Sequence, residues 1–220
     1  MDIIKESKNH FMETKYDLAI CIVSYNTKEL IKNCLNSIYE KTKGVSFKVI
    51  IVDNASKDGT PEMVEKNFPE ALLIRSPKNL GFPSACNLAL AEAEGRYFVL
   101  FNSDTELVND AFTELVNFMD VTPDCGIACP QLYYFDGRVQ ISHYKFRDPK
   151  ARSLWEVRPR LSELKYLLGF SNPPKKRKQK PREVPSVPME VDRPRGVCFM
   201  MRMKCADEIG PMDGNFFIFA

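Results

Sequence analysis

The sequence predicts an α/β fold in which a mostly parallel sheet carries helices on both of its faces. Three units, each an apolar run followed by an amphipathic stretch at helical spacing, precede a fourth apolar run at 95–101. Continuous apolar runs are typical of strands that are buried on both faces, as in parallel sheets. Each run ends abruptly in polar residues, and ligands of open α/β sheets collect at the carboxyl ends of the strands. The polar ends therefore predict a binding site.

Composition limits the class of protein. The 220 residues suffice for one sizeable domain, and 31 basic against 29 acidic residues give no reason to expect a nucleic-acid partner. Seven single cysteines without a Cys-x-x-Cys pair, and only two histidines, argue against a disulfide framework or a zinc site. We expect reduced thiols in the cytoplasm. The charged first sixteen residues predict no signal peptide, and no apolar run reaches the ~18 residues of a membrane span.

The first unit begins with the apolar run 18–23, which ends at Ser24-Tyr25-Asn26. Asn26 and Glu29 predict a capping box at the start of the following helix. The turn contains no glycine, whereas a dinucleotide-binding fold would place Gly-x-Gly-x-x-Gly here and a sugar nucleotidylyltransferase a glycine-rich loop. Both of these classes are therefore disfavoured.

The second apolar run, 47–52, ends at Asp53, and Thr60-Pro61 predicts the N-cap and first turn of the next helix. A carboxylate at this strand end can accept a hydrogen bond from the imide N–H of a uracil or thymine ring. The alternative is that Asp53 only accepts hydrogen bonds from amides of its own turn. The third run, 71–75, leads to Asn79-Leu80-Gly81-Phe82 and a helix rich in small residues.

The fourth run, 95–101, is the predicted centre of the sheet and ends in Asn102, Ser103 and Asp104. On an extended backbone Asn102 and Asp104 point to one side, which pairs an amide oxygen with a carboxylate. Such a pair suits a divalent cation, Mg²⁺ or Mn²⁺, that keeps some waters and is shared with a diphosphate. The alternative is that Asp104 caps the next helix.

The second half of the sequence is less regular. We expect a helix over 111–119 and a hairpin around Asp136-Gly137-Arg138. A lone His143 beside a tyrosine is more often structural or solvent-facing than a ligand or a base. Further elements are expected as strands at 126–132 and 195–202 and a broken helix at 154–168.

The segment 172–182 is rich in proline and in basic residues, which cannot build a core. A solvated loop is one interpretation. Attraction to anionic lipid head groups, and with it peripheral contact with a membrane, is the other.

Four motifs, at 23–26, 52–60, 79–82 and 102–105, resemble family 2 glycosyltransferases in this order and spacing. The resemblance is closest to the rhamnosyltransferase-like branch. It implies the GT-A fold, which is a Rossmann-like fold of nucleotide-diphospho-sugar transferases. It also implies that Asn102 replaces the first aspartate of the metal-binding Asp-x-Asp motif. The residues that the resemblance assigns to nucleotide-sugar binding are Ser24, Asn26, Asp53, Asn79, Gly81, Asn102 and Ser103, with Asp104 for the metal and Gly196 and Asp213 for the acceptor side.

The resemblance also predicts how the chain is divided. We expect a polar N-terminal extension over 1–16 and a single domain over 17–220. Within the domain, 17–106 is the expected nucleotide-binding half, and 107–220 is an incomplete acceptor half with a basic loop at 171–190.

The family places its general base in a Glu-Asp-x-Asp run that would follow just beyond Ala220, and Gly214 stands where a glutamate normally follows Asp213. We therefore expect the 220 residues to bind a donor but to show negligible transfer.

The resemblance implies an inverting transferase that acts in cell-surface polysaccharide synthesis. The expected donor is dTDP-rhamnose or a UDP-sugar, and the expected acceptor is a glycan or a lipid-linked molecule. The expected location is the cytoplasm. If the basic run binds lipid, the protein would lie at the inner face of the cell membrane. The alternative is a nucleotide-sugar-binding module without transferase activity, because the base motif is absent from these residues. A Glu-Asp-x-Asp run directly after position 220 would favour the transferase, and a natural stop there would favour the binding module.

Overall fold

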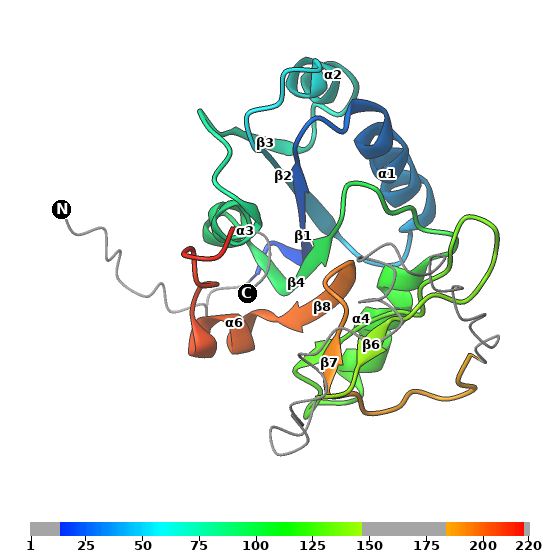
Figure 1. Ribbon diagram of the computed structural model, residues 1–220. Coiled ribbons are helices and arrows are strands. Elements are labelled where there is room, and N and C mark those ends of the chain that lie inside the picture. Colours follow the sequence, from blue (N-terminus) through cyan, green and yellow to red (C-terminus); the bar gives the residue numbers. More distant parts are fainter. Residues whose placement is uncertain (1–13, 147–183, 218–220) are drawn as a thin grey trace, which may run out of the picture. The chain divides into compact units, whose positions relative to one another are not determined.

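The computed structural model describes residues 14–146 and 184–217 (Figure 1). Contacts divide the chain into a larger unit, which runs to Pro130 and resumes at Pro194, and a smaller unit over Gln131–Arg193. The described strands are β1 (Tyr16–Ser24), β2 (Phe47–Asp53), β3 (Leu72–Arg75), β4 (Gly95–Phe101), β5 (Ile127–Ala128), β6 (His143–Tyr144), β7 (Arg193–Pro194) and β8 (Cys198–Arg202). The described helices are α1 (Lys28–Lys41), α2 (Thr60–Asn67), α3 (Phe82–Ala91), α4 (Ala111–Asp120) and α6 (Met203–Ile209).

The sheet of the larger unit has six strands in the order β3-β2-β1-β4-β8-β5. The first four are parallel, and β8 runs antiparallel to both β4 and β5. This confirms the predicted α/β architecture with a mostly parallel sheet. Because β1 lies between β2 and β4, successive units turn to opposite sides at β1, and such a switch point opens a crevice at the carboxyl ends of the strands.

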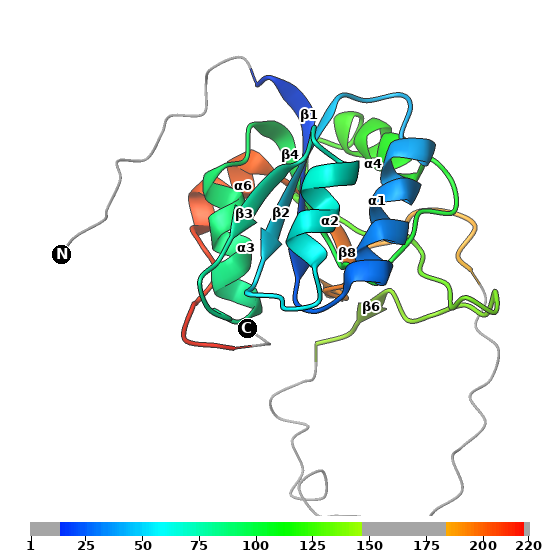
Figure 2. The ribbon, with the colours of Figure 1, turned by 90° about the horizontal axis from the view of Figure 1, so that it is seen from above.

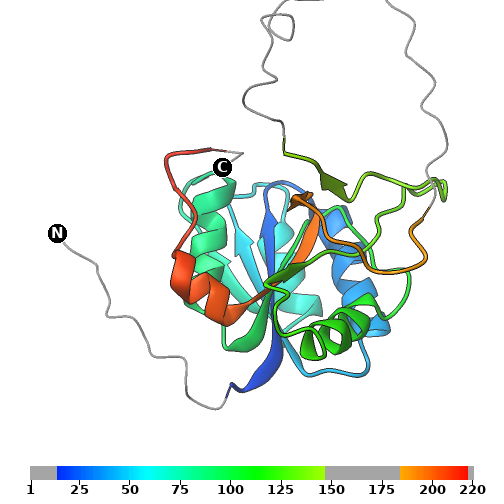
Figure 3. The ribbon, with the colours of Figure 1, turned by 90° about the horizontal axis from the view of Figure 1, so that it is seen from below.

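Helices cover both faces of this sheet, α1, α2 and α4 on one and α3 and α6 on the other (Figures 2 and 3). On the first face α1 buries Ile31, Leu35 and Ile38, and Phe112 of α4 meets Phe101 edge-on at 5.4 Å. On the second face small residues of α3, such as Ala85 and Ala89, let the helix lie close to the strands. The abrupt polar ends of the strands are thus held between two apolar layers.

A polar network fixes the end of the sheet at which the parallel strands begin. The Arg202 guanidinium donates to the carbonyl oxygens of Cys125, Met119 and Thr122 and to the Tyr97 hydroxyl. Arg96 pairs with Asp120 at 2.8 Å, and this hydrogen bond holds the pKa of the Asp120 carboxyl below its usual value. The polar residues at the amino ends of the parallel strands therefore have a structural role.

Two predicted helix starts are wrong. α1 begins at Lys28 with Thr27 as its N-cap, and Asn26 has φ 54° while its side-chain oxygen accepts from the Lys57 N–H at 2.8 Å, so the predicted capping box does not form. α2 has Gly59, with φ 80°, as its N-cap in place of Thr60.

Two predicted strands are shorter in the structure. The strand expected at 126–132 is reduced to Ile127–Ala128, and the strand expected at 195–202 begins at Cys198.

The smaller unit contains the predicted hairpin, in which Tyr133 bridges Val139 and Gly137 has φ 79°. The two-stranded sheet consists of β6 and β7. The broken helix expected at 154–168 and the basic segment 172–182 lie outside the described residues. No helix in the described part of the chain has the length and apolarity that a bilayer span requires.

Candidate functional site

A pocket of about 360 Å³ lies at the carboxyl ends of β1 and β4, where the sheet has its switch point. Its lining comes from Val23, Tyr25, Thr27, Asn54, Asn79, Gly81, Phe82, Asn102, Ser103, Asp104 and Phe217. The structure thus brings together five of the predicted site residues, from the loops that follow β3 and β4. The volume is within the range of small-molecule sites, roughly 300–1,000 Å³.

Asp53, at the end of β2, is almost completely buried, with 2% of its surface exposed. One carboxylate oxygen, Oδ2, accepts from the Ser56 N–H at 3.0 Å, which matches the turn-binding alternative. The other, Oδ1, is buried and has no hydrogen-bond partner among the described residues. Buried carboxylate oxygens are rarely left without a donor, so Oδ1 indicates a missing N–H or O–H group.

Asn54, the next residue, is also buried and organises the loop after β3. Its Nδ2 donates to Asn79 Oδ1 at 2.9 Å and to the Gly81 carbonyl at 3.2 Å. Its Oδ1 accepts from the Leu80 N–H at 2.8 Å. Sequence reasoning placed Asn54 only within a turn. Its position beside Asp53 at a strand end was the available signal.

Ser24, Asn26 and Asp53 are not among the residues that line the pocket. The Ser24 hydroxyl is fully buried and lies 2.8 Å from the Thr27 hydroxyl, which donates to Ser103 Oγ at 3.3 Å. These hydroxyls connect the ends of β1 and β4, and Thr27 and Ser103 themselves line the pocket. Tyr25, which is about half exposed, also lines the pocket at the end of β1.

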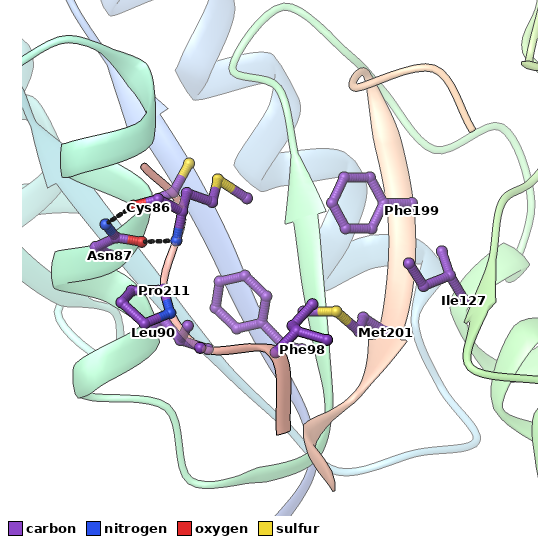
Figure 4. A pocket seen from close by; sticks show the side chains of 11 residues that line it. Cys86, Asn87, Leu90, Phe98, Ile127, Phe199, Met201 and Pro211 are labelled. Carbon is purple, nitrogen blue, oxygen red and sulfur yellow. Dashed lines mark hydrogen bonds between the residues drawn. The ribbon is translucent and has the colours of Figure 1, made fainter. Parts of the chain in front are cut away.

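The C-terminal part of the described chain supplies one wall. The Phe82 N–H donates to the Phe217 carbonyl at 2.7 Å, and Asn87 exchanges two hydrogen bonds with the Met212 backbone (dashed lines in Figure 4). A Cβ atom on Gly81 would lie 2.5 Å from the Phe217 carbonyl oxygen, so only glycine fits there. Sequence reasoning missed Phe217 as a lining residue.

Asp104 is exposed at the pocket, and Asn102 is half-buried beside it. Asp104 does not cap the next helix, because α4 begins at Ala111 and Asp110 accepts from its Thr113 N–H at 3.3 Å. Among the described residues no group of three His, Cys, Asp or Glu side chains could hold a metal. One carboxylate and one amide fit only a cation whose other coordination positions are filled by water and by a bound molecule such as a diphosphate.

The two residues predicted for the acceptor side are exposed and outside the pocket lining. Gly196 follows β7, and nothing lies within 4 Å of the position its Cβ would take. Asp213 accepts from the backbone and side chain of Asn215, both at 2.9 Å. His143 lies on β6 of the smaller unit.

A second pocket, of about 250 Å³, lies on the α3 face of the sheet (Figure 4). Phe98, Phe199, Met201 and Leu90 make it almost entirely apolar. Its amide side chain, Asn87, is already bonded to Met212, and the Cys86 thiol in its lining is almost completely buried.

Comparisons with known proteins agree with this geometry. The family model described as "Glycosyl transferase family 2" matches residues 19–209. Abequosyltransferase RfbV of Salmonella typhimurium is 34% identical over 113 residues, which are 49% of this chain and 34% of that protein. The Staphylococcus epidermidis teichoic acid poly(glycerol phosphate) polymerase is 33% identical over 100 residues, which are 44% of this chain and 14% of the polymerase.

Among solved structures, S. aureus TarS in complex with UDP-GlcNAc is 26% identical, with a TM-score of 0.50 over 59% of this chain and 38% of that one. The chain thus spans about a third or less of the length of the transferase and the polymerase that it matches.

Proposed function

This chain belongs to glycosyl transferase family 2 and has the GT-A fold, and we propose that it transfers a sugar, with inversion, from a nucleotide-diphosphate donor to a glycan or lipid-linked acceptor. The relative named as a teichoic acid poly(glycerol phosphate) polymerase supports a role in making a cell-surface polymer. For the donor we propose a pyrimidine nucleotide, as in dTDP-rhamnose or a UDP-sugar. The TarS complex with UDP-GlcNAc supports the uridine alternative.

The observation that carries the proposal is the unpartnered Oδ1 of Asp53. A buried polar atom without a partner costs about 1–3 kcal/mol, and more when it is charged. The imide N–H of uracil or thymine is a donor of the right kind, and it would leave Oδ2 on the Ser56 amide. Adenine presents an exocyclic amino donor beside an acceptor ring nitrogen, so it does not match the single N–H between two acceptors that uracil and thymine present.

Asp104, with Asn102, is the proposed contact for a divalent cation, Mg²⁺ or Mn²⁺. Bound there, the cation would supply positive charge for the departing diphosphate. The described pocket lining has no Lys or Arg that could supply it. Asn79 and Gly81 would border the sugar diphosphate, held in place by the Asn54 side chain. Ser103, which lines the pocket, would contact the donor, and Ser24 and Asn26 would act from outside the lining by fixing its loops.

A second candidate function, a nucleotide-sugar-binding module without transfer, is favoured by one observation. Asp104 is the sole carboxylate in the pocket lining that the structure describes, and we assign it to the cation. A transferase needs a further carboxylate to deprotonate the acceptor hydroxyl, and losing such a base typically costs ~10²–10⁴-fold in rate. Transfer by the longest form of the protein, measured with a glycan acceptor, separates the two functions.

We further propose a cytoplasmic location, with the acceptor half, including Gly196 and Asp213, facing a membrane-bound substrate. No disulfide joins the described cysteines, which fits a reducing compartment. The basic run at 172–182 supports contact with anionic lipid.

Calorimetry with UDP, dTDP, GDP and ADP tests the proposed donor class. UDP and dTDP should bind at least ~10-fold more tightly than ADP, and Asp53→Ala should remove most of that difference, since a hydrogen bond to a charged group contributes about 1.5–3 kcal/mol. Asp124→Ala, an exposed carboxylate outside the pocket, is the control and should bind like the wild type. Equal affinities for all four nucleotides would show that Asp53 does not read the base.

A further inference from the structure

The smaller unit carries an unusual number of exposed aromatic side chains. Phe135 is 84% exposed and Phe146 is 71% exposed, and Tyr133, Tyr134 and Tyr144 are between 38% and 45% exposed. Single exposed apolar residues are common on soluble proteins. Five aromatic residues exposed within the 14 residues of 133–146 are a cluster, and exposed apolar clusters mark interaction sites.

Folding of the hairpin does not explain the aromatic residue at its tip. The Gly137 N–H donates to the Tyr134 carbonyl, and the Tyr134 N–H donates to the Arg138 carbonyl, both at 2.8 Å. Phe135 and Asp136 therefore occupy the two central positions of the turn. Asp136 and Gly137 satisfy the requirements of the turn, Gly137 through its φ of 79°. The turn would form equally well with a polar residue at 135.

Two arginines of the smaller unit lie against exposed aromatic rings. Arg138 neutralises Asp136 at 2.7 Å and stacks over Tyr134, with 5.4 Å between the guanidinium carbon and the ring centroid. Arg193 stacks in the same way over Tyr144 at 5.0 Å. Aromatic rings with arginine beside them are typical of protein surfaces that lie at the water–bilayer interface.

The two units differ in net charge, and the smaller unit is the positive one. Residues 131–193 contain 15 Lys and Arg against 7 Asp and Glu, a net charge of +8, and the rest of the chain has −6. An anionic bilayer attracts the first and repels the second. The aromatic cluster thus belongs to the unit whose sequence such a surface would attract.

We propose that the 133–139 hairpin inserts Phe135 into the interfacial region of an anionic lipid bilayer, with Arg138 at the level of the head groups. The backbone N–H groups of Tyr134 and Gly137 are already hydrogen-bonded, which lowers the cost of placing the tip in an apolar medium. The hairpin shares no residue with the donor pocket. Its failure to bind lipid would leave the proposed transfer intact, and failure of the donor assignment would leave the hairpin proposal intact.

Co-sedimentation of the full chain with vesicles tests the proposal. Vesicles of phosphatidylcholine alone are compared with vesicles of equal parts phosphatidylcholine and phosphatidylglycerol. Wild type should bind only the anionic vesicles, and Phe135→Ser should lower the partition coefficient by about tenfold, as expected for one apolar side chain removed from a bilayer. Val121→Ser is the matched control, because Val121 is 80% exposed in the larger unit. It should bind like the wild type.

Phe135→Trp gives a second measurement. It should retain binding, and its emission should shift to the blue on anionic vesicles once the signal of the native Trp155 is subtracted. Circular dichroism melts should coincide for all variants, because the tip fills no core. Unchanged binding of Phe135→Ser, or equal binding to both vesicle types, would overturn the proposal. A loss seen instead in affinity electrophoresis through an immobilised polysaccharide would also overturn it, in favour of a glycan platform.

Discussion

Replacing Gly81 by alanine tests whether the pocket depends on the contact between the loop after β3 and Phe217. Gly81 has φ 79° and ψ 172°, a region of backbone space that is essentially restricted to glycine. Gly210 has nearly the same backbone, with φ 78° and ψ −174°. The two sites differ in their surroundings. A Cβ at 81 would lie 2.5 Å from the Phe217 carbonyl oxygen, whereas nothing lies within 4 Å of a Cβ at 210.

The magnitude follows from this difference. Alanine at either site costs roughly 1–3 kcal/mol of backbone strain. At 81 the Phe217 backbone must also move, which breaks its hydrogen bond from the Phe82 N–H and adds about 0.5–1.5 kcal/mol. Gly81→Ala should therefore lower the free energy of unfolding by about 1 kcal/mol more than Gly210→Ala does, or roughly 2–4 °C more in Tm.

Urea unfolding followed by circular dichroism measures the stability, and calorimetry with the donor nucleotide sugar measures the pocket. Only Gly81→Ala should weaken donor binding, because only that variant displaces the Phe217 wall. Equal loss of stability and unchanged donor affinity in both variants would refute the reasoning.

Three further predictions concern single side chains. Asn54→Asp places a carboxylate against the Asn79 and Gly81 oxygens that the amide now serves, so urea unfolding should show a loss of at least ~1–3 kcal/mol; a stable variant would contradict the assigned network. Asp104→Ala should weaken nucleotide binding in Mn²⁺ by about 1.5–3 kcal/mol and leave Tm unchanged, and identical titrations with Mn²⁺ and with EDTA would count against a cation there. Because Arg96 lowers the pKa of Asp120, the ionised carboxyl stabilises the fold above its ordinary pKa of 3.8, and this contribution is lost as the pH falls through the lowered value. Asp120→Asn should therefore be less stable than wild type at pH 7 and converge with it in strongly acid solution; a constant difference would exclude the ion pair as the cause.

The parallel strands could be predicted because their signal is local. The runs that became β1, β2 and β4 are mostly buried, whereas β3, an edge strand, is only partly buried; Asp53 and Asn102 stand where two of the buried runs end. Since parallel strands place their carboxyl ends at one edge, the pocket followed from the pattern. The GT-A fold was likewise implied by the resemblance, and the family match confirms it. The rhamnosyltransferase-like branch and the sugar itself stay predictions.

The errors at helix starts have a tertiary cause. Asn26 has the side chain of a capping residue, but its oxygen accepts from the Lys57 backbone of the neighbouring loop instead. Gly59 takes the N-cap of α2 with a positive φ, while Asp58 accepts from the Thr60 N–H at 3.1 Å. A local pattern cannot show that the loops after β1 and β2 lie side by side and compete for these groups.

The division of the chain into a donor half and an acceptor half stays a prediction, and one contact crosses it. The motifs that predicted donor binding all precede residue 107, yet Phe217 lines the same pocket and receives a hydrogen bond from the first residue of α3. The Met212 backbone and the Asn87 side chain tie the same segment to α3 a second time. A donor bound against Phe217 would therefore press on the segment that carries Asp213, which is proposed for the acceptor side. Because the two contacts share one backbone, we expect donor binding to order this segment and so to prepare the place where the acceptor binds.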